Sequence, residues 1–192
     1  MSPLLSTRAN ASALGYRSLV AGAATSFESI ATVGVGSGGA ANVEFTSIPG
    51  TYTHLQLRAY ALPNGNNNFG VTFNNDTAAN YSTHQLQGDG ASASALGASS
   101  TNSMFLLGLY TDSSSYAGVT IIDILDYANT NKYKTIRALS GQDGNATGTA
   151  TDWRVTFGSG NWRSTNAVTS IKISSPSWRQ YSHFALYGIR SA

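Results

Sequence analysis

Apolar and polar side chains alternate along most of the chain, most clearly over residues 53–62. Every second residue there is apolar, and in an extended strand such residues share one face. The opposite face carries polar and aromatic side chains, namely His54, Gln56, Arg58 and Tyr60. The pattern predicts a strand with one buried face and one face that meets solvent or another subunit.

Similar runs, separated by turns rich in glycine, proline and asparagine, predict about ten strands and no helix. They occupy residues 27–35, 42–48, 53–62, 69–73, 81–86, 104–110, 118–125, 134–139, 153–157, 166–174 and 181–189. The runs at 104–110 and 118–125 are the most apolar, which is typical of strands buried on both faces. Residues 88–102 (GDGASASALGASSTN) hold almost no large apolar side chain, so we expect an exposed loop there.

The regular spacing of short strands favours an all-β fold, namely an antiparallel β-sandwich of jelly-roll-like design. A closed barrel is the alternative. We expect one domain, residues 27–192, preceded by a short N-terminal arm, residues 1–26. The arm has scattered leucine and tyrosine side chains but no core of its own. It is either a flexible tail or an arm that becomes ordered against a neighbouring chain.

Composition narrows the classes of partner. The 192 residues are 41% hydrophobic and only 10% charged, with 11 basic and 9 acidic side chains. The basic residues are scattered, so we expect no nucleic-acid partner, which would need a clustered basic face. The chain has no cysteine, which excludes disulfides and thiolate metal sites. Polar residues interrupt every apolar stretch, so we expect no signal peptide, no membrane partner and synthesis in the cytoplasm.

Catalytic motifs are absent from the sequence. The three histidines lie too far apart for a local metal-binding motif: His54, His84 and His183. Asp123 and Asp126 have the chemistry for glycoside hydrolysis or for binding calcium. Asp123 lies inside a predicted strand, however, and we expect it to pair with a basic residue such as Arg137 on an adjacent strand. Because no GxSxG motif is present either, we expect no enzymatic activity, no metal and no cofactor.

Several segments resemble small virion structural proteins of tailed bacteriophages. They are SIATVGVGSGGAANVEFTSIPGTYTHLQLR, FNNDTAANYSTHQLQGDG, IDILDYANTNKYKT and HFALYGI. The resemblance covers approximately residues 27–190 and leaves out the N-terminal arm. Proteins of this group serve either as capsid decoration (cement) proteins, which are often trimers, or as tail-fibre and receptor-binding parts.

The resemblance implies a place in the virion. The leading hypothesis is a decoration protein that binds the major capsid protein on the outer capsid surface as a homotrimer and stabilises the shell. The expected contact residues are Leu4, Leu5, Arg8, Tyr16 and Arg17 of the arm, with His54, Gln56, Arg58 and Tyr60 on the sheet. The alternative is a tail-fibre or receptor-binding module that recognises a host glycan through Trp153, Trp162, Tyr127 and Tyr133. Length favours decoration, because the sequence shows no heptads or repeats of a fibre shaft.

Overall fold

A computed structural model describes residues 26–64, 69–106, 117–143 and 153–190, which form twelve strands and no helix. The strands are β1 (Phe27–Gly34), β2 (Ala40–Phe45), β3 (His54–Ala61), β4 (Phe69–Phe73), β5 (Tyr81–Gly88), β6 (Ala93–Thr101), β7 (Met104–Leu106), β8 (Gly118–Ile124), β9 (Lys134–Asp143), β10 (Trp153–Trp162), β11 (Ile171–Trp178) and β12 (His183–Ile189). The arm residues Leu4, Leu5, Arg8, Tyr16 and Arg17 lie outside the described residues.

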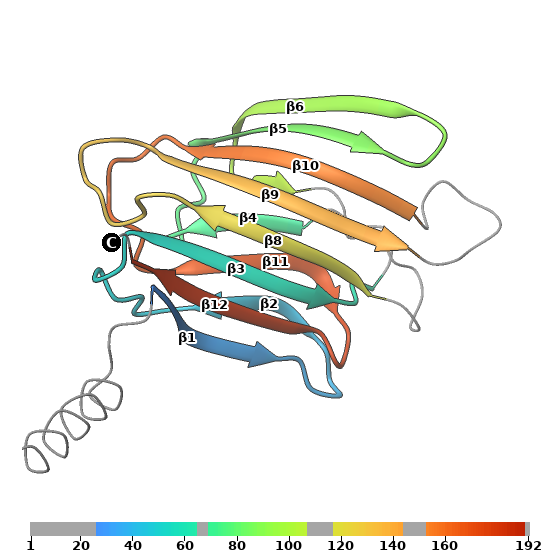
Figure 1. The fold of residues 1–192 in the computed structure, drawn as a ribbon, viewed down its shortest axis with the longest axis horizontal. Helices are drawn as coiled ribbons and strands as arrows, with labels where there is room; N and C mark the ends of the chain where they lie inside the picture. Colours follow the sequence, from blue (N-terminus) through green and yellow to red (C-terminus); the bar gives the residue numbers. More distant parts are fainter. Residues whose placement is uncertain (1–25, 65–68, 107–116, 144–152, 191–192) are drawn as a thin grey trace, which may run out of the picture.

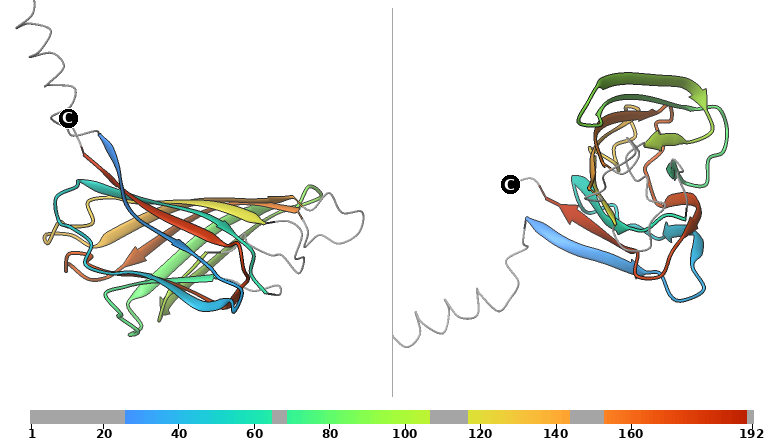
Figure 2. Two further views of the ribbon diagram at one scale, coloured as in Figure 1. Left: turned by 90° about the horizontal axis from the view of Figure 1, so that it is seen from below. Right: turned by 90° about the vertical axis from the view of Figure 1, so that its right-hand side faces the viewer.

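The strands form two antiparallel sheets. The eight-stranded sheet runs in the order β1-β12-β3-β8-β9-β10-β5-β6, and the four-stranded sheet runs in the order β2-β11-β4-β7. The larger sheet lies across the front of Figure 1, and the views in Figure 2 show the two layers from other sides. The predicted antiparallel β-sandwich is confirmed. The jelly-roll arrangement is not confirmed, since twelve described strands divided eight and four do not follow the eight-stranded jelly-roll plan.

Aromatic side chains fill the space between the sheets. Trp162 on β10 stacks with Tyr81 on β5 at a ring-centroid distance of 6.4 Å and meets Phe73 on β4 edge-on at 5.7 Å. Trp178 on β11 meets Phe184 on β12 edge-on at 5.0 Å. Aromatic pairs of this geometry contribute about 0.5–1.5 kcal/mol each beyond their burial. The Trp162–Phe73 and Trp178–Phe184 pairs each join one sheet to the other, so they hold the two layers together.

The alternating pattern on β3 is confirmed. Leu55, Leu57 and Ala59 are buried, whereas Arg58 and Tyr60 on the same strand are exposed. Strand β9 alternates in the same way, with its even-numbered residues inside. The period-2 signal therefore identified which residues of β3 enter the core.

Residues 88–102 form the turn and the second strand of a hairpin rather than the expected loop. Strand β6 pairs with β5 along nearly its whole length, and Asp89 accepts the backbone N–H groups of Ala91 and Ser92 at the turn, at 3.0 and 2.7 Å. The prediction was wrong because a strand at the sheet edge is held by backbone hydrogen bonds. It therefore needs no large side chains, and β6 is largely exposed on both faces.

Two further strands depart from the expected pattern. All five residues of β4 are buried, although alternation predicted one apolar face only. The strand expected over residues 166–174 instead begins at Ile171 and continues to Trp178 as β11, and its register with β2 shifts between Ser174 and Trp178, on either side of Pro176. A proline is tolerated at such a point because the regular ladder is already interrupted.

Candidate interaction surface

Large apolar side chains gather on the outer face of the eight-stranded sheet, over strands β8, β9, β10 and β5. The strand register sets them in two adjoining rows. One row is Val119, Gly141 and Val155, and the other is Ile121, Leu139, Phe157 and Leu86. Val155 is 61% exposed and Phe157 is 50% exposed. We call the six large residues Leu86, Val119, Ile121, Leu139, Val155 and Phe157 the apolar face.

Directly beneath the apolar face, the inner side of β8, β9 and β10 is unusually polar. Thr120, Ser140, Gln142 and Thr156 point inward and are almost fully buried. The Thr120 and Ser140 hydroxyls lie 2.5 Å apart and share a hydrogen bond, whereas the Thr156 hydroxyl makes none in the part of the chain that the structure describes. Beneath the apolar face, at Thr120, Ser140 and Thr156, the two faces have therefore exchanged the polarity expected of a half-buried sheet. Farther along the same strands the inward residues are apolar, as at Ile122 and Ile136.

Close packing explains why β10 turns small residues inward. Gly160 lies against the side chains of Met104 on β7 and Ile136 on β9, so that a Cβ at this position would come within 2.7 Å of the Met104 sulfur. The strand can therefore approach β7 only with glycine inside. Because side chains alternate, this register sends Trp153, Val155 and Phe157 outward.

A hollow opens in the apolar face above Gly141. Gly141 has no side chain, and a Cβ built there would meet nothing within 4 Å. A depression of about 590 Å³ covers this position, and its walls include Val119, Val155 and Trp153. A second, smaller depression of about 290 Å³ adjoins it and is bounded by Ile121 and Leu139 as well. The surface thus has both projecting side chains and a concavity between them.

An ion pair borders the apolar face on one side. Arg137 on β9 donates to Asp123 on β8 at 2.7 Å, and Gln56 on β3 donates to the other oxygen of Asp123 at 2.8 Å. Partial burial raises the pKa of Asp123, but the hydrogen bonds from Gln56 and Arg137 outweigh it and hold the pKa below its usual value. The charges at this border therefore neutralise each other.

The four residues predicted as contacts on β3 lie in three different surroundings. Arg58 lies over the rings of Phe27 and Tyr187, at 5.1 and 5.3 Å, and donates to Gln56. Gln56 in turn is held by Asp123, so these two side chains are engaged within the subunit. Tyr60 is exposed and lies opposite Val119, at the edge of the apolar face.

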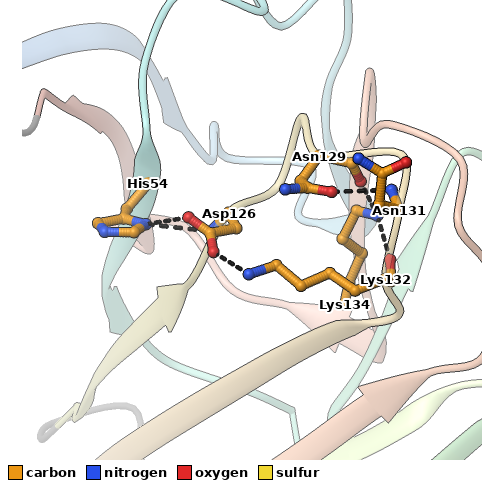
Figure 3. A network of polar contacts seen from close by, with 6 residues as sticks. All are labelled: His54, Asp126, Asn129, Asn131, Lys132 and Lys134. Atoms are coloured by element: carbon orange, nitrogen blue, oxygen red, sulfur yellow. Dashed lines mark hydrogen bonds and ion pairs between the residues drawn. The ribbon is translucent and has the colours of Figure 1, made fainter.

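His54 belongs to a separate polar cluster at one end of the sheet (Figure 3). The Asp126 backbone N–H donates to His54 Nδ1 at 3.0 Å, and the Asp126 carboxylate also binds the Lys132 ammonium group. The hydrogen bond from Lys132 is the main reason that the pKa of Asp126 is lowered. Asp126 sits in a left-handed turn conformation, φ 48°. It fixes the connection between β8 and β9.

Lys134 stabilises the β8–β9 connection from its buried side. Its ammonium group is buried and donates to the carbonyl oxygens of Asn129, Lys132 and Thr165, at 2.5, 2.9 and 3.2 Å. Burial lowers the pKa of Lys134. The cation is thus held by carbonyl dipoles that the turn would otherwise leave unpaired.

The aromatic residues predicted for glycan binding do not form one surface. Trp162 is 2% exposed and stacks in the core, and Tyr127 is fully buried with its hydroxyl donating to the Pro49 carbonyl oxygen. Trp153 and Tyr133 are exposed, but they lie at opposite ends of β9, next to Asp143 and Lys134 respectively. The prediction of Trp162 and Tyr127 as sugar-stacking residues is therefore wrong, because the sandwich needs both rings for its core.

Sequence reasoning missed the apolar face. The run at 118–125 was interpreted as a strand buried on both faces, but Val119 and Ile121 are exposed. The available signal was the run's apolar character at both odd and even positions, together with the Trp153, Val155 and Phe157 alternation nearby. Both signals are equally consistent with a buried core and with a surface that another subunit covers.

Among the described residues, no three His, Cys, Asp or Glu side chains gather as metal ligands would. In the same part of the chain no helix is long and apolar enough to cross a membrane.

Comparison with known proteins adds little. No family model matches the chain, and no curated protein matches it. One solved structure that it resembles is the SPRY domain of human HERC1, at 13% sequence identity over 69% of this chain and 78% of that chain, with a TM-score of 0.22. A likeness that weak carries no argument.

Proposed function

We propose that this chain is a structural protein of a tailed-phage virion. In the leading form of the proposal it is a capsid decoration protein that binds the major capsid protein on the outer shell as a homotrimer. Support comes from the sequence resemblance noted above and from one structural observation, the apolar face. A subunit that exposes six large apolar side chains in contiguous rows is built to be covered by protein.

The proposed mechanism is a linkage effect. A decoration protein binds only the assembled shell, so its binding energy shifts the equilibrium away from disassembly. At a free concentration one hundred times the dissociation constant, such a partner stabilises its target by about 2.7 kcal/mol per site. In this proposal the arm grips the shell through Leu4, Leu5, Arg8, Tyr16 and Arg17, and the sandwich forms the trimer above it.

Location in the virion tests the proposal directly. Purified virions would be imaged with an antibody or tag on this chain. Label spread over the head supports decoration, and label at the tail tip rejects it in favour of the alternative below. Absence of the chain from the virion contradicts both forms. Deletion of residues 1–20 should abolish binding to capsids if the arm grips the shell, and retained binding would assign the grip to the sandwich.

A tail-located receptor-binding module is the second candidate. The observation that favours it is the depression beside Trp153, which combines an exposed aromatic ring with the polar residues Asp89 and Asp143 in its wall. Sugar sites combine such a ring with hydrogen-bonding groups. Binding to a glycan array that is lost in Trp153→Ala, but kept in Tyr133→Ala, would support this candidate over decoration.

A further inference from the structure

We propose that the apolar face is the surface through which copies of this chain bind one another. The faces of neighbouring copies meet around a rotation axis, and a projecting side chain of one copy enters the hollow above Gly141 of the next. This inference deepens the proposed function, since it rests on the proposed self-association. It does not depend on where the protein is located in the virion.

The exchange of polarity between the two faces is the first argument. Thr120 and Thr156 are buried in the subunit, while Val119, Val155 and Phe157 are left in solvent. Single exposed apolar residues are ordinary, but six in register on four neighbouring strands form a contiguous patch. Such a patch is costly in water and is expected to be covered in the working state.

Charge selects the kind of partner. No position of the apolar face is charged, and the nearest ion pair, Asp123 with Arg137, is already neutralised within the subunit. A strongly acidic or basic partner would therefore find no opposite charge here. A second copy presents the same apolar centre and the same internally paired border at Asp123 and Arg137, so the two centres match. The charged residues in the wall of the hollow, Asp89, Asp143 and Arg154, would lie in the polar rim.

The shape of the apolar face also favours a second copy as the partner. The hollow above Gly141 is flanked by Val119 and Val155, and the neighbouring row projects Phe157, Leu139 and Leu86. A surface that carries both a concavity and a set of projecting side chains is self-complementary, which symmetric association requires. Phe157 is the largest of the projecting side chains and is the one that we assign to the hollow.

The size of the face suits the centre of an interface. Four strands spaced ~4.8 Å apart, with two rows of side chains ~6.8 Å apart along them, give a footprint on the order of 250 Å². A standard interface buries ~800 Å² on each partner, with an apolar centre and a polar rim. Tyr60 and Trp153 border the apolar face and would belong to that rim.

The first experiment measures mass by analytical ultracentrifugation of the full-length wild-type chain over about 1–100 µM. A dimer or trimer supports the inference, and a monomer throughout overturns it. Phe157→Lys would put like charges into the contact and should weaken association at least about a hundredfold. Tyr133→Lys is the matched control, since Tyr133 is an aromatic of similar exposure away from the apolar face. Its association should equal that of the wild type.

Two more variants test whether the apolar face, and not another segment of the chain, joins the copies. Gly141→Trp fills the hollow, where a Cβ meets nothing within 4 Å, and should weaken association without loss of folding. Deletion of residues 1–25 should leave association intact. If that deletion alone yields monomers, the arm and not the apolar face joins the copies, and the inference is overturned. Association unaffected by both Phe157→Lys and Gly141→Trp overturns it equally.

A measurement on the wild-type chain avoids any question of misfolded variants. Trp153 is 44% exposed beside the hollow, whereas Trp162 and Trp178 are buried, and the chain has three tryptophans. Acrylamide quenching therefore reports on Trp153. We expect the quenching constant to fall at least about twofold as the chain associates. An unchanged constant across the mass transition would mean that the copies meet elsewhere. Both measurements use purified protein, so a monomer would leave the virion location to be tested by imaging.

Discussion

Asp123 and Arg137 face each other directly on β8 and β9, and the Arg137 guanidinium lies 2.7 Å from the Asp123 carboxylate. The pairing was predicted from sequence and is confirmed. Its energetic value is limited, because the Arg137 side chain is largely exposed and solvent screens the charges. The pair matters more as the neutral border of the apolar face.

Acid should weaken the fold through this carboxylate. The pKa of Asp123 is below its usual value in the folded chain, so its contribution is complete above the unfolded pKa, about 3.9, and is lost as pH falls through the folded pKa. Asp123→Asn should reduce the free energy of unfolding at pH 7 by up to about 1 kcal/mol. The difference from wild type should shrink as pH falls below about 3.9 and through the folded pKa, as measured by urea unfolding at each pH. A difference that did not change with pH would mean that the loss is not electrostatic.

A side chain at position 188 should destabilise the fold. A Cβ there would overlap the ring of Tyr52, whose hydroxyl donates to Glu28 at 3.0 Å. Gly188→Ala must displace that ring and should lower the free energy of unfolding by about 1–3 kcal/mol. Gly34→Ala on β1 is the control, since a Cβ at Gly34 meets nothing within 4 Å. Equal melting temperatures for the two variants would contradict the prediction.

Removing the buried cation should loosen the β8–β9 connection. Lys134→Met leaves the carbonyl groups of Asn129, Lys132 and Thr165 without their donor, which should cost about 1–3 kcal/mol. Chemical denaturation measures this loss. Lys132→Met removes an exposed ammonium group and should cost less than about 1 kcal/mol. If the two variants were equally stable, the hydrogen bonds of the buried Lys134 ammonium group would not stabilise the β8–β9 connection.

Two buried threonines should respond in opposite directions. The Thr156 hydroxyl is buried without a hydrogen bond among the described residues, so Thr156→Val should raise the free energy of unfolding by about 1 kcal/mol. The Thr120 hydroxyl shares a hydrogen bond with Ser140. Thr120→Val should therefore lower the free energy of unfolding by about the same amount. Denaturant midpoints of the pair provide the test, and stabilisation by both changes would reject the assigned hydrogen bonding.

Local periodicity was sufficient to predict the fold class. Alternation set the inward residues of β3, and the expected pairing of Asp123 with Arg137 fixed two neighbouring strands. Strand β6 could not be predicted, because its Ala and Ser side chains carry no hydrophobic signal and its backbone pairing depends on β5. Periodicity also does not say which of two faces is buried.

The apolar face illustrates that second limit. On β10 the sequence alternates large apolar with small or polar residues, which by itself would send Phe157 inward. Packing of Gly160 against Met104, a contact between residues far apart in the sequence, reverses the direction. Likewise, Trp153 and Trp162 are nine residues apart on one strand and therefore face opposite sides, but only the three-dimensional arrangement decides that Trp162 is the one in the core.

Pairing of β12 with both β1 and β3 has a consequence for how the chain folds. Phe27 is opposite Ile189, and His54 is opposite Ile189 as well, so residues more than a hundred positions apart must meet before the sheet is complete. During synthesis β1 and β3 leave the ribosome long before their common neighbour exists. Such distant pairings slow folding and keep strand edges open meanwhile. We therefore expect slow refolding, and a nascent chain that depends on chaperones until residue 189 has emerged.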